Sequence, residues 1–363
     1  MQRSIYLRPV GIFAPSSDQD QGGDVWGGLP LAGTGLAFSA LEVIERTGTK
    51  SSRRVIGLGE IFERDWGRNT LSASDLVERV HANRPRLAGL ALDRPLIMGI
   101  VNVTPDSFSD GGRHADPEAA IAHGLALATE GADILDIGGE STRPGSDPVP
   151  LDEELARVLP VIEGLKTACD ARISIDTRKA LVMQRAAAAG ADIINDVSAL
   201  SHDPDGMAAA AEADLPVVLM HAQGDPKTMQ DAPRYGDVLL DVFDYLERRI
   251  ATCEAAGIAR QHLLVDPGIG FGKTLSHNLM LMHGLSLFHG LGVPLLVGAS
   301  RKRFIGILTG VDVAGERVSG SIGAALAAAG QGAHILRVHD VKATRDALTV
   351  WRAAVTGAAP PPA

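Results

Sequence analysis

The stretch Leu96-Ile-Met-Gly-Ile-Val-Asn-Val103 is an apolar run that delivers one polar side chain, Asn102, near its end. A short run of this kind is typical of a buried strand. The same form recurs in Ile134–Gly138, Ile173–Asp176, Ile193–Val197, Val217–His221, Leu263–Asp266, Pro294–Ser300 and Ile335–His339. Helix-like stretches rich in Ala and Leu separate most of these runs. The alternation predicts an α/β fold, a (β/α)8 TIM barrel whose active site is built by the loops after the strands.

The chain divides near residue 90. Residues 91–355 carry the repeating pattern and are predicted to form the barrel, and residues 356–363 form a Gly/Ala/Pro tail that we expect to be flexible. Residues 1–90 are interpreted as an N-terminal extension, either a small appended domain or an arm on the barrel. Leu71–Asn83 has helical spacing, whereas Phe38–Arg46 and Arg54–Ile61 fit strands or short helices. The extension carries no chemistry of its own, so we expect it to support folding, assembly or regulation.

Composition narrows the function classes. The chain has 363 residues, of which 45% are hydrophobic and 21% charged, and this is enough for a large core. Its net charge of −10 argues against nucleic acid as a partner. No apolar run reaches about 18 residues, so no membrane partner is expected. The two cysteines, Cys169 and Cys253, predict no disulfide framework, which favours a reducing, cytoplasmic location.

Two early strands run into loops of small and polar residues. The first loop follows Asn102 and contains Phe108, an aromatic residue that is unusual in an exposed loop. The second follows Ile134–Gly138 and contains one cation, Arg143. Polar, glycine-containing loops of this kind suit an active-site lid. Asp136 falls in mid-strand, where a buried carboxylate needs partners, so it is either a structural hub or part of the site.

These two segments belong to a longer series of motifs: Ile173-Ser-Ile-Asp-Thr-Arg-Lys179, Ile194-Asn-Asp196, Leu219-Met-His221, Asp266-Pro-Gly-Ile-Gly-Phe-Gly-Lys273, Ser300-Arg-Lys302 and Arg337-Val-His-Asp340. In this order the chain resembles the dihydropteroate synthase family over about residues 95–350. The resemblance implies a transferase of folate biosynthesis that condenses 6-hydroxymethyl-7,8-dihydropterin diphosphate with p-aminobenzoate and releases pyrophosphate, usually with Mg²⁺. It also implies a homodimer and a sulfonamide target.

The pterin is a flat heterocycle whose edge carries hydrogen-bond donors and acceptors. Asp176, Asn195, Asp266 and Lys302 supply both kinds of group from four strand ends. The resemblance implies that these four residues form the pterin pocket and that Met220 packs on the ring.

The diphosphate requires cations and hydrogen-bond donors. Arg337 and His339 alternate on the eighth strand, so both are predicted to point to one face. The resemblance adds Thr142 to this subsite and places Asn102 beside Mg²⁺. No zinc-type cluster of His, Cys and carboxylates is evident, so a Mg²⁺ held mostly by phosphates and water fits better. Arg143, Lys302, Arg337 and His339 are the predicted catalytic residues.

For p-aminobenzoate, the resemblance points to Phe108, Arg143, Pro144, Phe271 and Arg303. Many family members have Ser where this chain has Arg303. If strand alternation continues past Lys302, it turns the Arg303 side chain away from the pterin. We therefore expect Arg143, delivered by the second loop, to matter more than Arg303.

Two alternative functions use the same fold. A pterin-binding methyltransferase-type barrel would keep the pterin-edge residues without needing both early loops or the Arg337/His339 pair. A catalytically silent paralogue would bind pterin without turnover. An NTPase is excluded, because Pro267 occupies the position where a phosphate-binding loop ending in Gly272-Lys273-Thr274 requires its first glycine.

Overall fold

The structure is a computed structural model that describes residues 3–15, 28–63, 73–104, 116–141, 147–224 and 228–359. Eight parallel strands form one sheet in the order β10-β9-β8-β7-β6-β5-β12-β11. A parallel bridge between Val265 and Leu295 joins the two ends of this order, so the sheet closes into a barrel. The strands are β5 (Leu96–Asn102), β6 (Ile134–Gly138), β7 (Arg172–Asp176), β8 (Ile193–Asp196), β9 (Val217–Met220), β10 (Leu263–Asp266), β11 (Leu296–Val297) and β12 (Ile335–Val338). The barrel prediction is confirmed.

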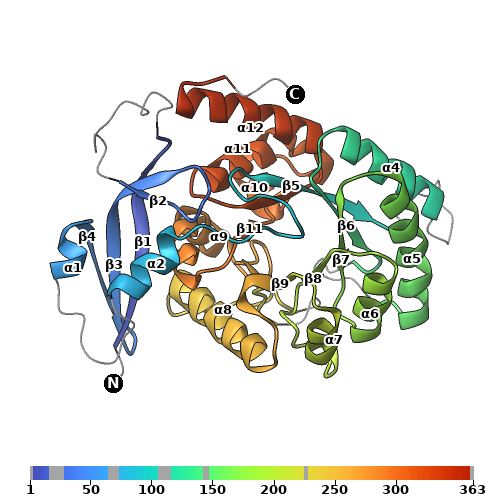
Figure 1. Cartoon of the computed structure of the whole chain (residues 1–363), viewed down its shortest axis with the longest axis horizontal. Helices are drawn as coiled ribbons and strands as arrows, with labels where there is room; N and C mark the ends of the chain where they lie inside the picture. Colours follow the sequence, from blue (N-terminus) through green and yellow to red (C-terminus); the bar gives the residue numbers. More distant parts are fainter. Residues whose placement is uncertain are drawn as a thin grey trace.

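Helices alternate with the strands and surround them (Figure 1). They are α4 (Pro117–Thr129), α5 (Leu151–Ala168), α6 (Ala180–Ala188), α7 (Gly206–Ala213), α8 (Val238–Ala255), α9 (Leu275–His283), α10 (Arg303–Thr309), α11 (Val318–Ala329) and α12 (Val341–Thr356), with 3-10 turns η2 (Arg260–His262), η3 (Leu285–Leu291) and η4 (Ala314–Glu316). Local signals set several starts: Thr274 closes a capping box on α9, and Asp237 caps α8. Within the described ranges, no helix is long and apolar enough to cross a membrane.

The barrel interior has an apolar bottom and a polar top. Side chains from the first halves of the strands pack into one cluster with Leu87 and Leu92, which plug the amino-terminal end: Leu96, Met98, Ile134, Ile193, Val218, Leu264, Leu296 and Ile335. Alternation along each strand then turns the residue two positions later inward as well. On β6 and β8 these are Asp136 and Asn195. Polar groups therefore converge at the carboxyl ends of the strands.

The N-terminal extension is an antiparallel sheet with two short helices. It contains β1 (Arg3–Phe13), β2 (Leu29–Pro30), β3 (Ala37–Thr47), β4 (Lys50–Gly57), α1 (Glu60–Glu63) and α2 (Ala73–His81). β3 is central, pairing with β1 along one side and with β2 and β4 along the other. Of the segments that the sequence left open, Phe38–Arg46 is a strand, whereas Arg54–Ile61 spans the end of β4 and the start of α1.

Both faces of this sheet are used. One face, with Leu41 and Val43, packs in a small core with Val77 and Val80 of α2. The other contributes Tyr6 and Ile44 to the main barrel core. The Tyr6 ring meets Phe243 of α8 edge-on, with 5.3 Å between ring centroids.

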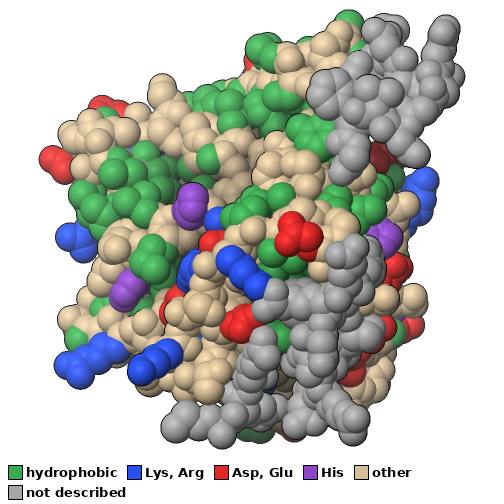
Figure 2. Space-filling view, turned by 90° about the vertical axis from the view of Figure 1, so that its left-hand side faces the viewer, with side chains coloured by type: hydrophobic (Ala, Val, Ile, Leu, Met, Phe, Trp, Pro, Cys, Tyr) green, Lys and Arg blue, Asp and Glu red, His purple; other side chains and the backbone are tan. Residues whose placement is uncertain are grey.

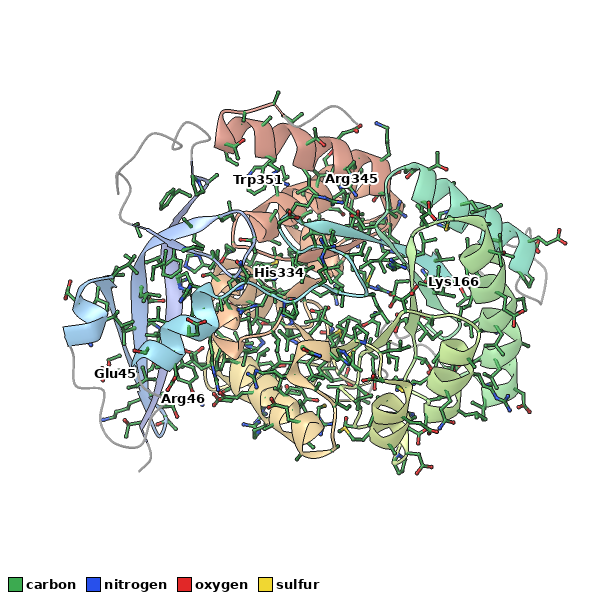
Figure 3. All side chains as sticks on the ribbon, in the orientation of Figure 1. Glu45, Arg46, Lys166, His334, Arg345 and Trp351 are labelled. Atoms are coloured by element: carbon green, nitrogen blue, oxygen red, sulfur yellow. The ribbon has the colours of Figure 1, made fainter. Side chains whose placement is uncertain are left out.

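Ion pairs join the sheet to α8 at the same boundary. Arg46, which is labelled in Figure 3, donates to Asp241 at 2.9 Å and also pairs with Asp244, and Arg53 pairs with Asp237 at 2.7 Å. The face of the molecule that carries this sheet shows acidic and basic side chains beside one another (Figure 2). The extension is thus a sheet docked along α8 and η3.

Candidate active site

A ring of buried polar residues occupies the carboxyl ends of the barrel strands. Asp176 is the last residue of β7, and its backbone partner on β8 is Asn195. Asp266 ends β10 and is paired in register with Met220 of β9. All four are less than a tenth exposed. The structure therefore brings together three predicted pterin-edge residues, on β7, β8 and β10, with Met220 of β9, which was predicted to pack on the ring.

Arg337 on β12 connects this ring across the barrel mouth. Its Nε donates to Oδ2 of Asp136 at 2.6 Å, and its Nη2 donates to Oδ2 of Asp176 at 2.8 Å. Asn195 Nδ2 donates to the same Asp136 oxygen at 3.1 Å. Burial acts to lower the pKa of Arg337, but the two carboxylates outweigh this effect and raise the pKa above its ordinary value. Asp136 is therefore a hub that orients both Arg337 and Asn195.

The carboxyl group of Asp176 is poised to change its charge near neutral pH. Burial raises its pKa to about 7, against the opposing effect of Arg337, and the neighbouring charge of Asp136 raises it further. In its ionised form the group is an acceptor only, as recognition of ligand N–H groups requires.

Lys302 and Asp266 form the opposite side of the ring. The Lys302 ammonium donates to the carbonyl of Ile269 and lies 4.6 Å from the centre of the Phe271 ring. Burial lowers its pKa to about 8, while Asp266 acts to raise it. Burial also raises the pKa of Asp266, whose Oδ1 accepts the Gly268 N–H at 2.7 Å. This side of the mouth supplies a cationic donor beside an acceptor.

Three of the predicted diphosphate residues, Asn102, Arg337 and His339, lie at or beside the end of β12. His339 follows that strand, and its Nδ1 lies 3.0 Å from the Ser300 hydroxyl. Asn102 ends β5, which is the neighbour of β12 in the barrel. Among the described residues, no group of three or more His, Cys, Asp or Glu side chains could hold a metal ion. Asn102 therefore stays a predicted Mg²⁺ ligand without an acidic cluster around it.

The ends of the second early loop are fixed by a buried ionic cluster. Lys179 Nζ bonds Glu140 Oε2 at 2.6 Å before the loop and the Val149 carbonyl at 2.7 Å after it, and it also pairs with Glu154. Burial acts to raise the pKa of Glu140, but the Lys179 and Arg178 side chains outweigh this effect and hold the pKa below its usual range. The predicted residues Phe108, Thr142, Arg143 and Pro144 lie outside the described residues.

The position of Arg303 differs from the expectation that strand alternation continues past Lys302. β11 contains only Leu296 and Val297, so no strand extends to Lys302. Arg301 has a left-handed backbone with φ of 57°, and Arg303 is the exposed first residue of α10. The alternation premise was wrong, because the chain turns before Lys302. Lys302 is the extended N-cap residue of α10 and Arg303 is its first helical residue, so strand alternation does not apply to this pair.

Sequence interpretation missed a buried pair next to this ring. Lys273 Nζ lies 3.0 Å from His221 Nδ1, and burial lowers the pKa of both groups. Both residues end motifs that were quoted from the sequence, but no pattern along the chain indicated that the two side chains meet. The two residues join the ends of β9 and β10.

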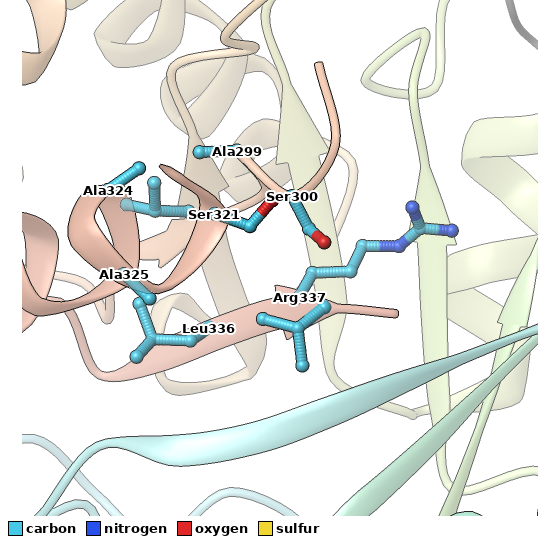
Figure 4. A pocket seen from close by; sticks show the side chains of 9 residues that line it. Ala299, Ser300, Ser321, Ala324, Ala325, Leu336 and Arg337 are labelled. Atoms are coloured by element: carbon cyan, nitrogen blue, oxygen red, sulfur yellow. The ribbon is translucent and has the colours of Figure 1, made fainter. Parts of the chain in front are cut away.

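A small, mostly apolar pocket lies outside the polar ring, between α11 and the last two strands (Figure 4). It is lined by Val297, Ala299, Ser300, Ser321, Ala324, Ala325, Leu336, Arg337 and Val338. The Arg337 side chain extends away from α11 in this view, toward the neighbouring strands. Of the residues that line this pocket, Arg337 and Ser300 also contact residues of the candidate active site. The pocket therefore lies behind the candidate active site and is not the active site itself.

Comparison with known proteins identifies relatives of the barrel. The family described as "Pterin binding enzyme" matches residues 98–339. The dihydropteroate synthase of Escherichia coli (strain K12) is 53% identical over 267 residues, which is 74% of this chain and 94% of that protein. Two structures of the Xanthomonas albilineans dihydropteroate synthase are also similar. The one with 4-aminobenzoic acid has 56% identity and a TM-score of 0.71, covering 77% of this chain and 100% of that chain. The one with 7,8-dihydropteroate has 54% identity and a TM-score of 0.69, covering 76% and 100%.

Proposed function

The chain belongs to the dihydropteroate synthases among the pterin-binding enzymes, and we propose that the polar ring at its barrel mouth carries their reaction. It condenses 6-hydroxymethyl-7,8-dihydropterin diphosphate with p-aminobenzoate to give 7,8-dihydropteroate and pyrophosphate. The observation that carries the assignment of the site is the convergence of Asp176, Asn195, Asp266 and Lys302 at one mouth, together with Arg337.

The pterin ring fits this set by its hydrogen-bonding edge. The carboxylates of Asp176 and Asp266 accept from the 2-amino and ring N–H groups, and Lys302 donates to the carbonyl or a ring nitrogen. Asn195 supplies both kinds of group, and its orientation is fixed by Asp136. Met220 offers an apolar, polarizable surface to the ring face. Burial of these groups makes each hydrogen bond strong and each mismatch costly.

The reaction requires charge stabilisation more than a strong base. The bond between the exocyclic methylene carbon and the diphosphate oxygen breaks, and pyrophosphate leaves with the bonding electrons. The amine nitrogen of p-aminobenzoate forms the new C–N bond and releases a proton to water. Arg337 and His339 stabilise the charge of the leaving group. Positioning of the two substrates supplies the rest of the rate enhancement.

A magnesium ion fits the diphosphate side of the mouth as an ion held by phosphate oxygens and water, with Asn102 as its protein ligand. The support is chemical: Asn102 offers a carboxamide oxygen at the end of β5, and the described residues form no acidic cluster there. When bound, such an ion would neutralise charge on the departing diphosphate. Chelation should abolish turnover, and added Mg²⁺ should restore it.

The second substrate is assigned to the side of the mouth that carries Phe271. Its ring lies against Lys302, so a p-aminobenzoate placed beside it would meet the pterin edge. Arg143, Pro144 and Phe108 are assigned to the same pocket from the two early loops, whereas Thr142 is assigned to the diphosphate subsite. Arg303 is assigned to its rim, because it is exposed at the start of α10.

A homodimer is part of the proposal. Its support is a set of exposed apolar side chains at the end of α10 and just beyond: Ile307 is 53% exposed, Leu308 55% and Val313 58%. Apolar side chains gathered on one surface favour a protein partner. Leu308→Asp should shift the protein toward monomer in sedimentation, whereas an unchanged dimer would place the interface elsewhere.

The free cysteines Cys169 and Cys253 support a reducing, cytoplasmic location.

The activity is tested by mixing the purified chain with both substrates and Mg²⁺ and measuring pyrophosphate and 7,8-dihydropteroate. The two products should appear in equal amounts and only when both substrates are present. Pyrophosphate release without p-aminobenzoate would indicate hydrolysis, and binding of pterin without either product would indicate a silent paralogue.

A further inference from the structure

The loop that follows β10 is held by its carbonyl groups. Each carbonyl from residue 269 to residue 272 accepts a side-chain hydrogen bond. The donors are Lys302 for Ile269, Gln230 Nε2 for Gly270 at 2.5 Å, Lys273 Nζ for Phe271 at 2.9 Å and Tyr235 Oη for Gly272 at 2.8 Å. Backbone that is tied at every residue presents its side chains in one fixed arrangement.

Lys273 stands apart among these donors. It is 3% exposed, and its hydrogen-bond partners are the Phe271 carbonyl, the His221 carbonyl at 3.3 Å and His221 Nδ1 at 3.0 Å, none of which is a carboxylate. Burial lowers the pKa of Lys273 well below its ordinary value. Burying an amine is unfavourable unless its hydrogen bonds compensate, and an apolar side chain would fill the same space at less cost. The role of Lys273 therefore lies in the hydrogen bonds that its side-chain nitrogen makes.

The loop also has no room to move toward β9. Gly268 and Gly272 have positive φ values of 67° and 60°. A Cβ atom at Gly268 would lie 1.8 Å from the His221 carbonyl oxygen, and one at Gly272 would lie 2.4 Å from that of Gln223. The loop therefore lies in close contact with residues 221–223. The Lys273 side chain holds the loop in this position by its hydrogen bond to the Phe271 carbonyl.

We propose that Lys273 is a positioning residue for the second substrate: it holds the Phe271 carbonyl against the end of β9 and so fixes the ring that forms a wall of the p-aminobenzoate pocket. This rests on the proposed assignment of Phe271 to that pocket. Lys273 Nζ donates to the Phe271 and His221 carbonyls and lies beside the His221 ring, and it makes no hydrogen bond with a pterin-edge side chain. Its charge does act on Asp266, whose pKa it lowers. Loss of Lys273 should therefore act mainly on the Michaelis constant for p-aminobenzoate, with a much smaller effect on pterin affinity and none on kcat.

The first test is Lys273→Met, which keeps the length and apolar stem of the side chain but removes its donors. The KM for p-aminobenzoate should rise about tenfold, as expected for loss of one buried hydrogen bond. The dissociation constant for the pterin and kcat should stay within about twofold. Lys166→Met, at an exposed ion pair on α5, is the matched control and should leave the KM, the pterin dissociation constant and kcat unchanged. An unchanged KM in Lys273→Met would overturn the proposal.

The second test asks whether Lys273 acts through Phe271. In a Phe271→Ala background, Lys273→Met should raise the KM no further, because the two residues form one unit. Effects that multiply would contradict the proposal. Lys273→Gln keeps a donor and should recover part of the affinity. If neither Lys273 variant folds, as judged by pterin titration, Lys273 is a folding residue and the proposal fails. A wild-type chain that makes no product would instead refute the proposed function.

Discussion

At the scale of single residues, the site works by giving similar groups different surroundings. Asp136 and Asp176 both accept from Arg337, but Asp136 also accepts from Asn195. Both of these donors meet Asp136 at Oδ2, and its Oδ1 has no hydrogen-bond partner among the described residues. Asp136 is only 1% exposed, whereas Asp176 is 8% exposed and keeps acceptor capacity toward the mouth. A carboxylate has two oxygens and about four acceptor positions, so one bond from Arg337 does not exhaust Asp176. This difference assigns Asp136 to positioning and Asp176 to ligand recognition.

The pH dependence of pterin affinity follows from two groups. Burial raises the pKa of Asp176 to about 7, so protonation below that pH removes an acceptor and weakens binding. Burial lowers the pKa of Lys302 to about 8, so deprotonation above that pH weakens a donor. Affinity measured by calorimetry should peak between pH 7 and 8. Lys302→Met should lower the maximum and remove the alkaline limb, whereas an alkaline limb that persists would assign it to another group.

Arg303 should be tolerant of substitution. It is exposed at the first position of α10 and has no hydrogen bond or ion pair among those described. Arg303→Ser should change kcat/KM by no more than about threefold, as for a surface substitution. Arg143→Ala should cost far more if the second loop delivers that side chain to the site. Steady-state kinetics of both variants will rank them, and the opposite ranking would move carboxylate recognition to α10.

The sequence predicted which residues meet at the mouth but not how they are connected. The resemblance supplied the pocket role of Asp176, Asn195, Asp266 and Lys302, and the convergence of strand ends in a barrel explains why the first three meet. The contact of Arg337 with Asp136 and Asp176 spans the barrel, and a pattern along the chain carries no information about it. The contact of Lys273 with His221 was missed for the same reason, because His221 follows β9 and lies 52 positions away in the chain.

At the scale of elements, the loop after β10 should be the least tolerant of side chains. Gly268→Ala would place a methyl group 1.8 Å from a backbone carbonyl, at a φ of 67°. Gly257→Ala is the matched control, since its φ of 94° is also strained but nothing lies within 4 Å. The control should cost about 1 kcal/mol, whereas Gly268→Ala should cost several times more and weaken both substrates. Denaturant unfolding measures the difference, and equal losses would show that the loop can yield.

Element boundaries were predicted well where the apolar runs were isolated. β6 and β10 have the bounds that the sequence indicated. The run Pro294–Ser300 became the two-residue strand β11, because Pro294 lacks an N–H and the chain leaves the sheet after Val297, before the turn at residues 300–301. That shortening is what undermined the alternation argument for Arg303. Pattern identifies the element, whereas its last residues depend on the loop that follows.

At the scale of the whole molecule, the N-terminal sheet covers apolar surface of the barrel. Tyr6 and Ile44 share a core with Phe243 and Phe288. Ser286 of η3 donates to the Pro9 carbonyl at 2.9 Å, and His334 bonds the Ala32 carbonyl at 3.0 Å. The family match begins at residue 98, so this sheet is an addition to the shared barrel. The sequence could not reveal the docking, because its contacts pair residues 184 to 302 positions apart.

Removal of the extension should therefore reduce stability without removing the chemistry. A chain that starts at Arg86 keeps the Leu87 and Leu92 plug but uncovers Phe243 and Phe288. Its melting temperature should fall by about 10 °C or more, while kcat per folded molecule stays close to that of the full chain. Calorimetric melting combined with active-site titration separates the two effects. Loss of kcat in a molecule that still binds pterin would show that the sheet contributes to the site.

The central claim is that the polar ring at the strand ends is the pterin pocket, and calorimetric titration of the dihydropterin diphosphate onto Asp176→Asn tests it most directly. Asp133→Asn is the control, because Asp133 is a mostly buried, ion-paired carboxylate at the opposite end of β6. Asp176→Asn should weaken binding about 10- to 150-fold, which corresponds to about 1.5–3 kcal/mol for a charge-assisted hydrogen bond. Asp133→Asn should lower stability and leave affinity unchanged. Unaltered affinity in Asp176→Asn would contradict the account.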